Sequence, residues 1–151
     1  MNNPNFVAAH AEHIRRGDKC PSRKGYAQSG AHIYCEHNAI DGTSYLQSYG
    51  AHYPLLYPIT TKSGGRLLVV NRRGYSNSTS KHINYASAEA DVWAYASDIR
   101  RDAAGVLEHL HAERARRQAA YDILKRKDTK KAAFMLSDMA RIDRDIMKIN
   151  N

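Results

Sequence analysis

The sequence predicts an α+β protein: a small antiparallel sheet of three to four strands, followed by a long helix and an antiparallel C-terminal helix. Short runs of aromatic and β-branched residues alternate with glycine-containing turns over residues 31–71. Apolar residues then recur at intervals of three and four from Val92, and the same period returns from Met135. We expect a single domain with three regions: 1–30, 31–86 and 87–151.

The first region is rich in histidine and small residues and is expected to be irregular. At most a short helix is expected there, at about Phe6 to Arg16, because Gly17, Pro21 and Gly25 interrupt any longer element. The second region is the β core. Its expected strands are the runs "AHIYCEH", "TSYLQSY", "PLLYPIT" and "RLLVVN", and the glycines of "KSGGR" predict a hairpin between the last two.

The third region is predicted to be a helical hairpin. Ser87 is a suitable N-cap, and an apolar seam runs from Val92 to Leu110, becomes polar at Glu113 and Arg117, and resumes at Ala120 and Leu124. A second helix is expected from about Thr129 to the end. Its seam consists of Met135, Met139, Ile142, Ile146 and Ile149. The two seams can pack against each other within one chain or join two chains as a homodimer.

Histidine and cysteine side chains raise the question of a metal site in the N-terminal region. Zinc usually requires closely spaced pairs of ligands, and no cysteine pair is close here, so we expect neither zinc nor another cofactor. The alternative ligand set is His10, His13, Cys20, His32, Cys35 and His37. The start of the chain lacks a signal peptide's apolar core, and no apolar run approaches the roughly 20 residues that span a bilayer. A cytosolic protein with two free thiols is therefore expected.

The segment "RRGYSNSTSKHINYA", residues 72–86, is the candidate binding loop. It would connect the last strand to the long helix, and its hydroxyl and cationic side chains suit phosphate, although such residues are also common in turns and caps. The predicted contacts are Arg72, Arg73, Tyr75, Ser76, Ser78, Ser80, Lys81 and His82. A second basic patch is expected on the helix at Arg114, Arg116 and Arg117.

Charge and aromatic content favour a polyanionic partner. The formal net charge is +8, and ten tyrosines are present, several of them close to Arg or Lys in the sequence. Cations can contact phosphates while aromatic rings stack on unpaired bases. Nucleic acid, or a host protein complex that handles it, is therefore the expected partner.

Two motifs resemble a family of small uncharacterised proteins of tailed bacteriophages. They are "SYGAHYPLL", Ser48 to Leu56, and "YSNSTSKHINY", Tyr75 to Tyr85, and the resemblance covers Tyr45 to Tyr85, about a quarter of the chain. Ser78 stands where the family has a threonine. The resemblance implies a phage protein acting in the cytoplasm of the bacterial host and an antiparallel β core. It implies no activity, because that family has none established.

These observations together predict a non-catalytic phage accessory protein that binds nucleic acid or a host complex associated with it. Inhibition of a host defence system, in the manner of an anti-CRISPR protein, would be one such role. A first alternative is a metal-independent ribonuclease that uses His52, Lys81 and His82 as acid, base and oxyanion stabiliser. A second alternative is a structural or scaffold protein that assembles through its helical hairpin.

Overall fold

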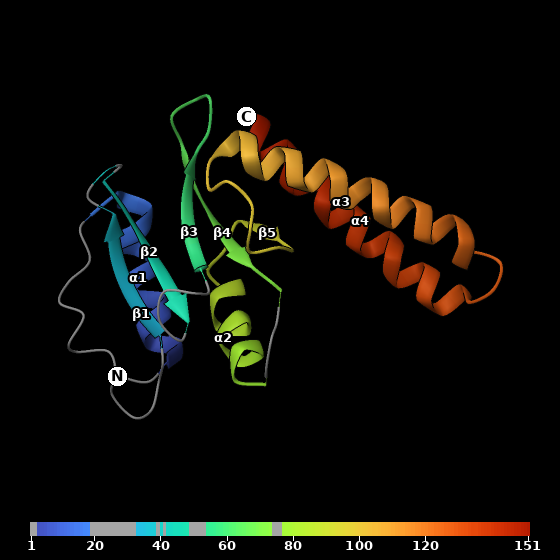
Figure 1. Ribbon diagram of the computed structural model, residues 1–151, viewed down its shortest axis with the longest axis horizontal. Coiled ribbons are helices and arrows are strands. Elements are labelled where there is room, and N and C mark those ends of the chain that lie inside the picture. The colour runs from blue at the N-terminus through green and yellow to red at the C-terminus, as the bar shows by residue number, and fades with distance from the viewer. Residues whose placement is uncertain (1–2, 19–32, 39, 41, 49–53, 74–76) are drawn as a thin grey trace.

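A computed structural model describes residues 3–18, 33–38, 40, 42–48, 54–73 and 77–151 of the chain (Figure 1). The helices are α1 (Asn3–Arg16), α2 (Asn77–Ser87), α3 (Ala103–Leu124) and α4 (Thr129–Asn150). The strands are β1 (Ile33–Asn38), β2 (Thr43–Ser48), β3 (Pro54–Thr60), β4 (Arg66–Asn71) and β5 (Val92–Ala94). The α+β class is confirmed.

Within the described residues the sheet has five strands in the order β1-β2-β3-β4-β5. The four strands predicted from the sequence are present and pair antiparallel, and the turn of "KSGGR" joins β3 to β4 as expected. The fifth strand, β5, pairs parallel with β4. The prediction of a purely antiparallel sheet of three to four strands is therefore corrected to a mixed sheet of five.

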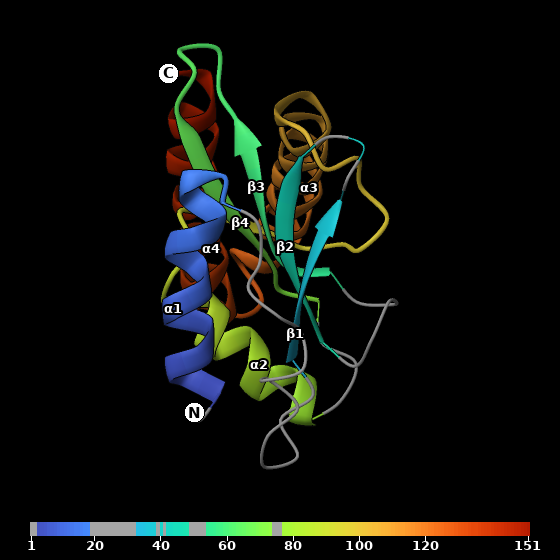
Figure 2. The same cartoon turned by 90° about the vertical axis from the view of Figure 1, so that its left-hand side faces the viewer.

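Helices cover both faces of this sheet (Figure 2). Strand residues alternate between the faces, so Leu56 and Val70 pack with α1 and α2, whereas Tyr57 and Val69 pack on the opposite side. The first cluster includes Phe6, Val7 and Ile14 of α1 together with Ile83 and Ala86 of α2. The second includes Val106 and Leu110 of α3 together with Ile142 and Ile149 of α4.

The prediction of one long helix from Ser87 is wrong. Instead α2 ends at Ser87, β5 follows, and α3 begins only at Ala103. Asp102 caps α3 by accepting a hydrogen bond from the Gly105 backbone N–H at 2.7 Å, and this bond lowers the pKa of the Asp102 carboxyl. Val92 and Ala94 are buried in β5 beside β4, so the helical spacing of residues 92, 96 and 99 does not continue the seam of α3.

The C-terminal helix is confirmed, and α3 and α4 form an antiparallel hairpin that extends from the body as an arm (Figure 1). Each helix has 22 residues, which corresponds to about 33 Å at 1.5 Å per residue. Met139, Ile142 and Ile149 of α4 are buried within the single chain. Three of the five residues of the predicted seam are thus covered within one chain, and Met135 and Ile146 are half-buried.

The polar interruption of the α3 seam is an ion-pair cluster inside the arm. Glu113 is buried, pairs with Arg116, and contacts Arg117 at 3.1 Å. Arg117 also reaches Asp138 of α4 at 2.8 Å. Opposite charges on the two helices therefore fix their alignment at the point where apolar residues are missing.

The arm is joined to the sheet through Asp145 of α4. This carboxylate is fully buried, and its Oδ2 accepts the Trp93 backbone N–H at 2.9 Å. Arg141 and Lys148 form ion pairs with it at 3.2 and 3.7 Å. The Trp93 ring lies between two guanidinium groups, with Arg72 at 4.0 Å and Arg141 at 4.2 Å from its centroid. Charge, hydrogen bonding and stacking thus hold the arm against β5.

No helix among the described residues combines the length and the hydrophobicity needed to cross a membrane.

Candidate nucleic-acid interface

The predicted binding loop is only partly a loop. Arg72 and Arg73 follow β4, but α2 starts at Asn77, so the second half of the segment is helical. Its buried residues, Ile83 and Ala86, pack on the sheet, whereas Ser80 and Lys81 are exposed. Ser78 lies in α2, and its side chain is outside the described residues, as are Tyr75 and Ser76.

The two arginines of this segment have different environments. The Arg72 guanidinium stacks on Trp93, and its Nη1 donates a hydrogen bond to Ser87 Oγ at 2.5 Å. It therefore links β4, α2 and β5. Arg73 is exposed, and its backbone N–H donates to Asn71 Oδ1 at 3.1 Å. Of the two, Arg73 is better placed to meet a large partner.

The residues of the ribonuclease alternative do not form a common surface in the described part of the chain. His82 is only 5% exposed, and its Nδ1 lies 2.6 Å from Ser48 Oγ, so the ring connects α2 to β2. Lys81 is exposed, and His52 lies outside the described residues. A buried His82 is poorly placed to reach the backbone of an RNA strand.

The second predicted patch is largely neutralised by carboxylates. Arg114 pairs with Asp143 at 3.2 Å, and Arg116 and Arg117 both pair with Glu113. Arg117 also lies over the Tyr95 ring, 4.4 Å from its centroid. These arginines contribute to the packing of the arm, and a phosphate would have to compete with their present partners.

The described histidines of the N-terminal region, His10, His13 and His37, each contact a different neighbouring residue. His10 is buried, donates from Nδ1 to the Phe6 carbonyl at 2.9 Å and stacks on the Phe6 ring. Burial lowers the pKa of His10. His13 lies 3.7 Å from Asp18, and His37 Nδ1 lies 3.1 Å from Ser44 Oγ. No group of three possible ligand side chains among the described residues is arranged to hold a metal ion.

The expectation of two free thiols is corrected at Cys35, which is disulfide-bonded. Cys20, the other cysteine of the chain, lies outside the described residues, as does His32. The expectation of free thiols rested on the absence of an export signal, which is evidence about the cellular compartment. It gives no information about which cysteines the fold brings together.

A hollow of about 320 Å³ lies at the base of the arm, and no site was predicted from the sequence there. It is lined by Asp98, Ile99, Arg100, Gly105, Glu108, His109 and Ala112. The Tyr95 backbone N–H donates to His109 Nε2 at 3.0 Å, so this nitrogen carries no proton. Burial also lowers the pKa of His109. The ring thus connects the residue that follows β5 to α3 beside the hollow.

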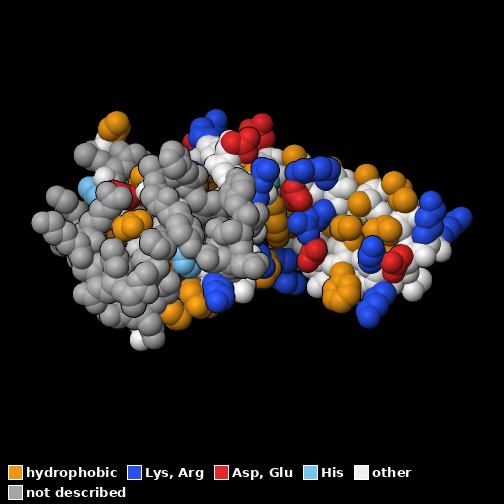
Figure 3. Space-filling view, turned by 60° about the horizontal axis from the view of Figure 1, so that its bottom comes forward, with side chains coloured by type: hydrophobic (Ala, Val, Ile, Leu, Met, Phe, Trp, Pro, Cys, Tyr) orange, Lys and Arg blue, Asp and Glu red, His pale blue; other side chains and the backbone are white. Residues whose placement is uncertain are grey.

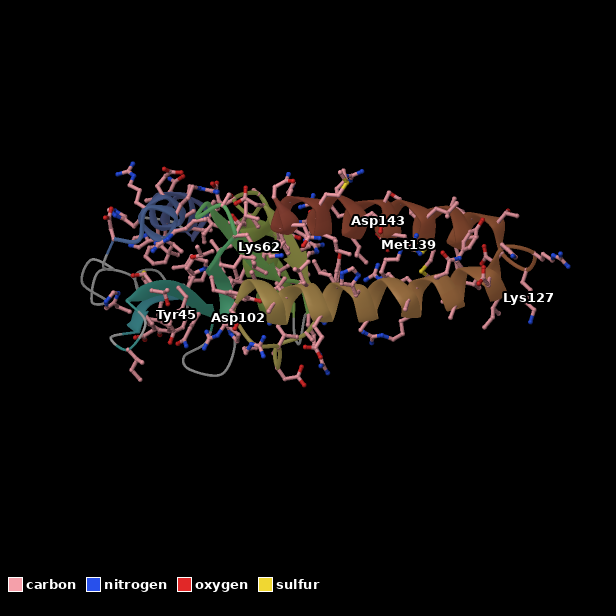
Figure 4. All side chains as sticks on the ribbon, turned by 90° about the horizontal axis from the view of Figure 1, so that it is seen from above. Tyr45, Lys62, Asp102, Lys127, Met139 and Asp143 are labelled. Carbon is pink, nitrogen blue, oxygen red and sulfur yellow. The ribbon has the colours of Figure 1, made fainter. Side chains whose placement is uncertain are left out.

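The far end of the arm carries the most concentrated positive charge. We call it the basic tip and define it as Lys125, Arg126, Lys127, Lys130 and Lys131. All five side chains are exposed. In the described part of the chain, Lys125 pairs with Asp122 at 3.6 Å, and no ion pair joins the other four to a carboxylate. Figure 3 shows Lys and Arg side chains at this end of the arm, and Figure 4 labels Lys127 there.

Helix electrostatics account for only part of the basic tip. Cations after the end of α3 are favourable, because carbonyl groups give a helix C-terminus negative character. Lys130 and Lys131 lie in the first turn of α4, where the same effect disfavours positive charge, and this turn has no acidic residue. The Asp128 carboxylate caps α4 by accepting the Lys131 backbone N–H at 3.0 Å. The fold therefore gains nothing from these two lysines as charges.

From the sequence, "KRKDTKK" predicts a turn, and no binding role was assigned to it. The available signal was its charge: five cations and one acid within seven positions. A hairpin turn with this composition presents its cations together at one point of the surface.

Comparisons with protein-family models, curated proteins and solved structures found no match to the chain. The resemblance to phage proteins stays a prediction, and function is inferred from the described side chains.

Proposed function

We propose that this protein binds nucleic acid without catalysing a reaction, and that the basic tip is its principal contact. The observation that carries the proposal is the exposure of five cations at the end of a projecting arm, four of them without an ion pair to a described carboxylate. Such cations release condensed counterions when they meet phosphates, which is the main source of sequence-independent affinity for nucleic acid.

The shape of the molecule supports this contact. The arm holds the tip away from the sheet and from α1 and α2 (Figure 1), so a long polyanion can approach without meeting the body. The ion pairs of Glu113 and Asp138 with Arg117 stiffen the middle of the arm. The basic tip is thus held at the end of a rigid arm. Little conformational entropy is lost on binding, because the arm is already ordered.

The proposal includes the expected phage setting and, as a second type of target, a host complex that carries nucleic acid. Arg73 and Lys81, exposed on the body, are the residues of the predicted loop best placed for an additional contact. A pull-down from host lysate distinguishes the two partner types, because a protein target stays bound after nuclease treatment and a nucleic acid does not.

The salt dependence of binding tests the proposal. Affinity of the wild-type protein for a labelled oligonucleotide should fall linearly with salt on logarithmic axes. Changing Lys130 and Lys131 to Gln should reduce that slope by about 1.4 on a single strand and about 1.8 on a duplex, since each phosphate contact contributes about 0.7 or 0.9. Fluorescence anisotropy measures both slopes. An unchanged slope in the variant would exclude the basic tip as the contact.

A further inference from the structure

Two large apolar side chains are exposed beside the basic tip. Phe134 of α4 is 66% exposed, and Ile123 of α3 is 63% exposed. Phe134 follows Lys130 by four residues and Lys131 by three, and Ile123 precedes Arg126 by three and Lys127 by four. Residues at these intervals are neighbours on a helix surface. Phe134 therefore lies about one turn from Lys130 and Lys131 on α4, whereas Arg126 and Lys127 follow Ile123 in the turn after the end of α3.

Phe134 and Ile123 lie on the same side of the arm. Phe134 precedes Arg141, which stacks on Trp93, by seven residues. Ile123 follows His109, which accepts a hydrogen bond from Tyr95, by fourteen. Because residues seven apart share a face, both side chains lie on the side from which the arm contacts β5. Figure 3 shows apolar side chains on the arm between the cations at its end and those near the body.

Packing within the chain does not explain this arrangement. Met139 and Ile142 fill the space between the two helices and are buried, whereas Phe134 projects from the arm. A single exposed apolar residue is ordinary, but an aromatic ring next to exposed cations matches a particular ligand. Unpaired nucleotides present a flat base and a phosphate a short distance apart.

We propose that the basic tip binds single-stranded nucleic acid, with Phe134 stacked on an unpaired base and neighbouring lysines on its phosphates. This inference rests on the proposed function and adds the class of partner. The positive charge of Lys130 and Lys131 complements the phosphates, and the exposed ring complements the base. A duplex offers the same phosphates but keeps its bases stacked inside, so Phe134 adds little affinity there.

The test compares Phe134→Ala with wild type on a single strand and on a duplex of equal length. Loss of one stacking contact should weaken single-strand binding by about tenfold or more and leave duplex binding unchanged. The salt slope should stay the same, because no cation is removed. Phe134→Trp should restore the affinity, since an indole ring also stacks on bases.

Leu136→Ala is the matched control. Leu136 is 47% exposed on the same helix, but two residues after Phe134 it lies on a different face. This variant should bind as wild type does. Circular dichroism and light scattering on each variant establish that helix content and mass are unchanged.

The outcomes separate this inference from the proposed function. Equal losses on single strand and duplex, or no loss in Phe134→Ala, overturn the stacking inference while a normal salt slope still supports nucleic-acid binding. Binding to vesicles rich in phosphatidylserine, with none to either oligonucleotide, overturns both. A halved mass in Phe134→Ala would show that the ring joins two copies of the chain, which also overturns the inference.

Discussion

Replacing Asp145 with alanine is expected to lower the free energy of unfolding by about 3–5 kcal/mol, because it removes one partner of a buried ion pair and leaves the other uncompensated. Asp145 is fully buried and accepts the Trp93 backbone N–H at 2.9 Å. Its removal also leaves Arg141, 3.2 Å away, without its carboxylate partner. The attachment of the arm to β5 would be weakened and would depend on apolar packing of Ile142 and Ile149, so urea denaturation should show both a lower midpoint and a less cooperative transition.

Asp143→Ala is the control for this prediction. Asp143 lies on the same helix but at the surface, where it pairs with Arg114 at 3.2 Å. Exposed pairs contribute only about 0–1 kcal/mol, so this variant should stay close to wild type. Asp145→Asn should fall between the two, since its amide oxygen can still accept the Trp93 N–H. Equal stability of all three variants would show that the arm is held by apolar packing alone.

Charge reversal at the tip is expected to separate binding from stability. Lys130→Glu combined with Lys131→Glu should weaken binding to nucleic acid by roughly a hundredfold at moderate salt, from about tenfold per lost phosphate contact. The same change places acids in the first turn of α4, where each is favourable by about 0.3–1 kcal/mol. The variant should therefore unfold at the same or a higher urea concentration. Anisotropy and urea titration together measure the two effects.

Lys62→Glu serves as the charge control, because it changes the net charge by half as much as the double tip variant at a site away from the tip. Lys62 is exposed in the turn between β3 and β4, and Figure 4 shows it on the body, away from Lys127 at the tip. If net charge alone governs affinity, Lys62→Glu should weaken binding as strongly per charge as the tip variant does. If the contact is localised at the basic tip, Lys62→Glu should weaken binding much less per charge than the tip variant does. Comparable losses per charge in the two variants would contradict a localised contact.

The β core could be predicted from the sequence because its signals are local. Short apolar runs identify β3 and β4, which are buried on both faces, and Gly64, with φ of 87°, permits the turn that joins them. The parallel strand β5 could not be predicted this way. It has three residues, and its partner β4 lies about twenty residues earlier in the chain. The apolar spacing of Val92, Ala96 and Ile99 matches that of a helix, so the segment was predicted to be helical and β5 was missed.

The candidate site was harder to predict, because a sequence gives the number of cations but not their partners. From the sequence alone, Arg114 and Arg117 were expected to be available to phosphate. In the structure, Asp143 and Asp138 of α4 form ion pairs with them. Arg72 was expected to contact phosphate, and its stacking on Trp93 could not be predicted from the sequence. The basic tip was recognisable as a charged run, but its exposure at the end of an arm follows only from the antiparallel packing of α3 and α4.

Photo-cross-linking to a single-stranded oligonucleotide tests the central claim, binding at the basic tip, most directly. A strand carrying photoreactive bases is bound to the wild-type protein, irradiated and digested, and the attached peptides are identified by mass spectrometry. Binding at the tip predicts cross-links within residues 123–134, with Phe134 among the modified positions. Cross-links confined to residues 72–82, with none on the arm, would contradict it and return the binding site to the connection between β4 and α2.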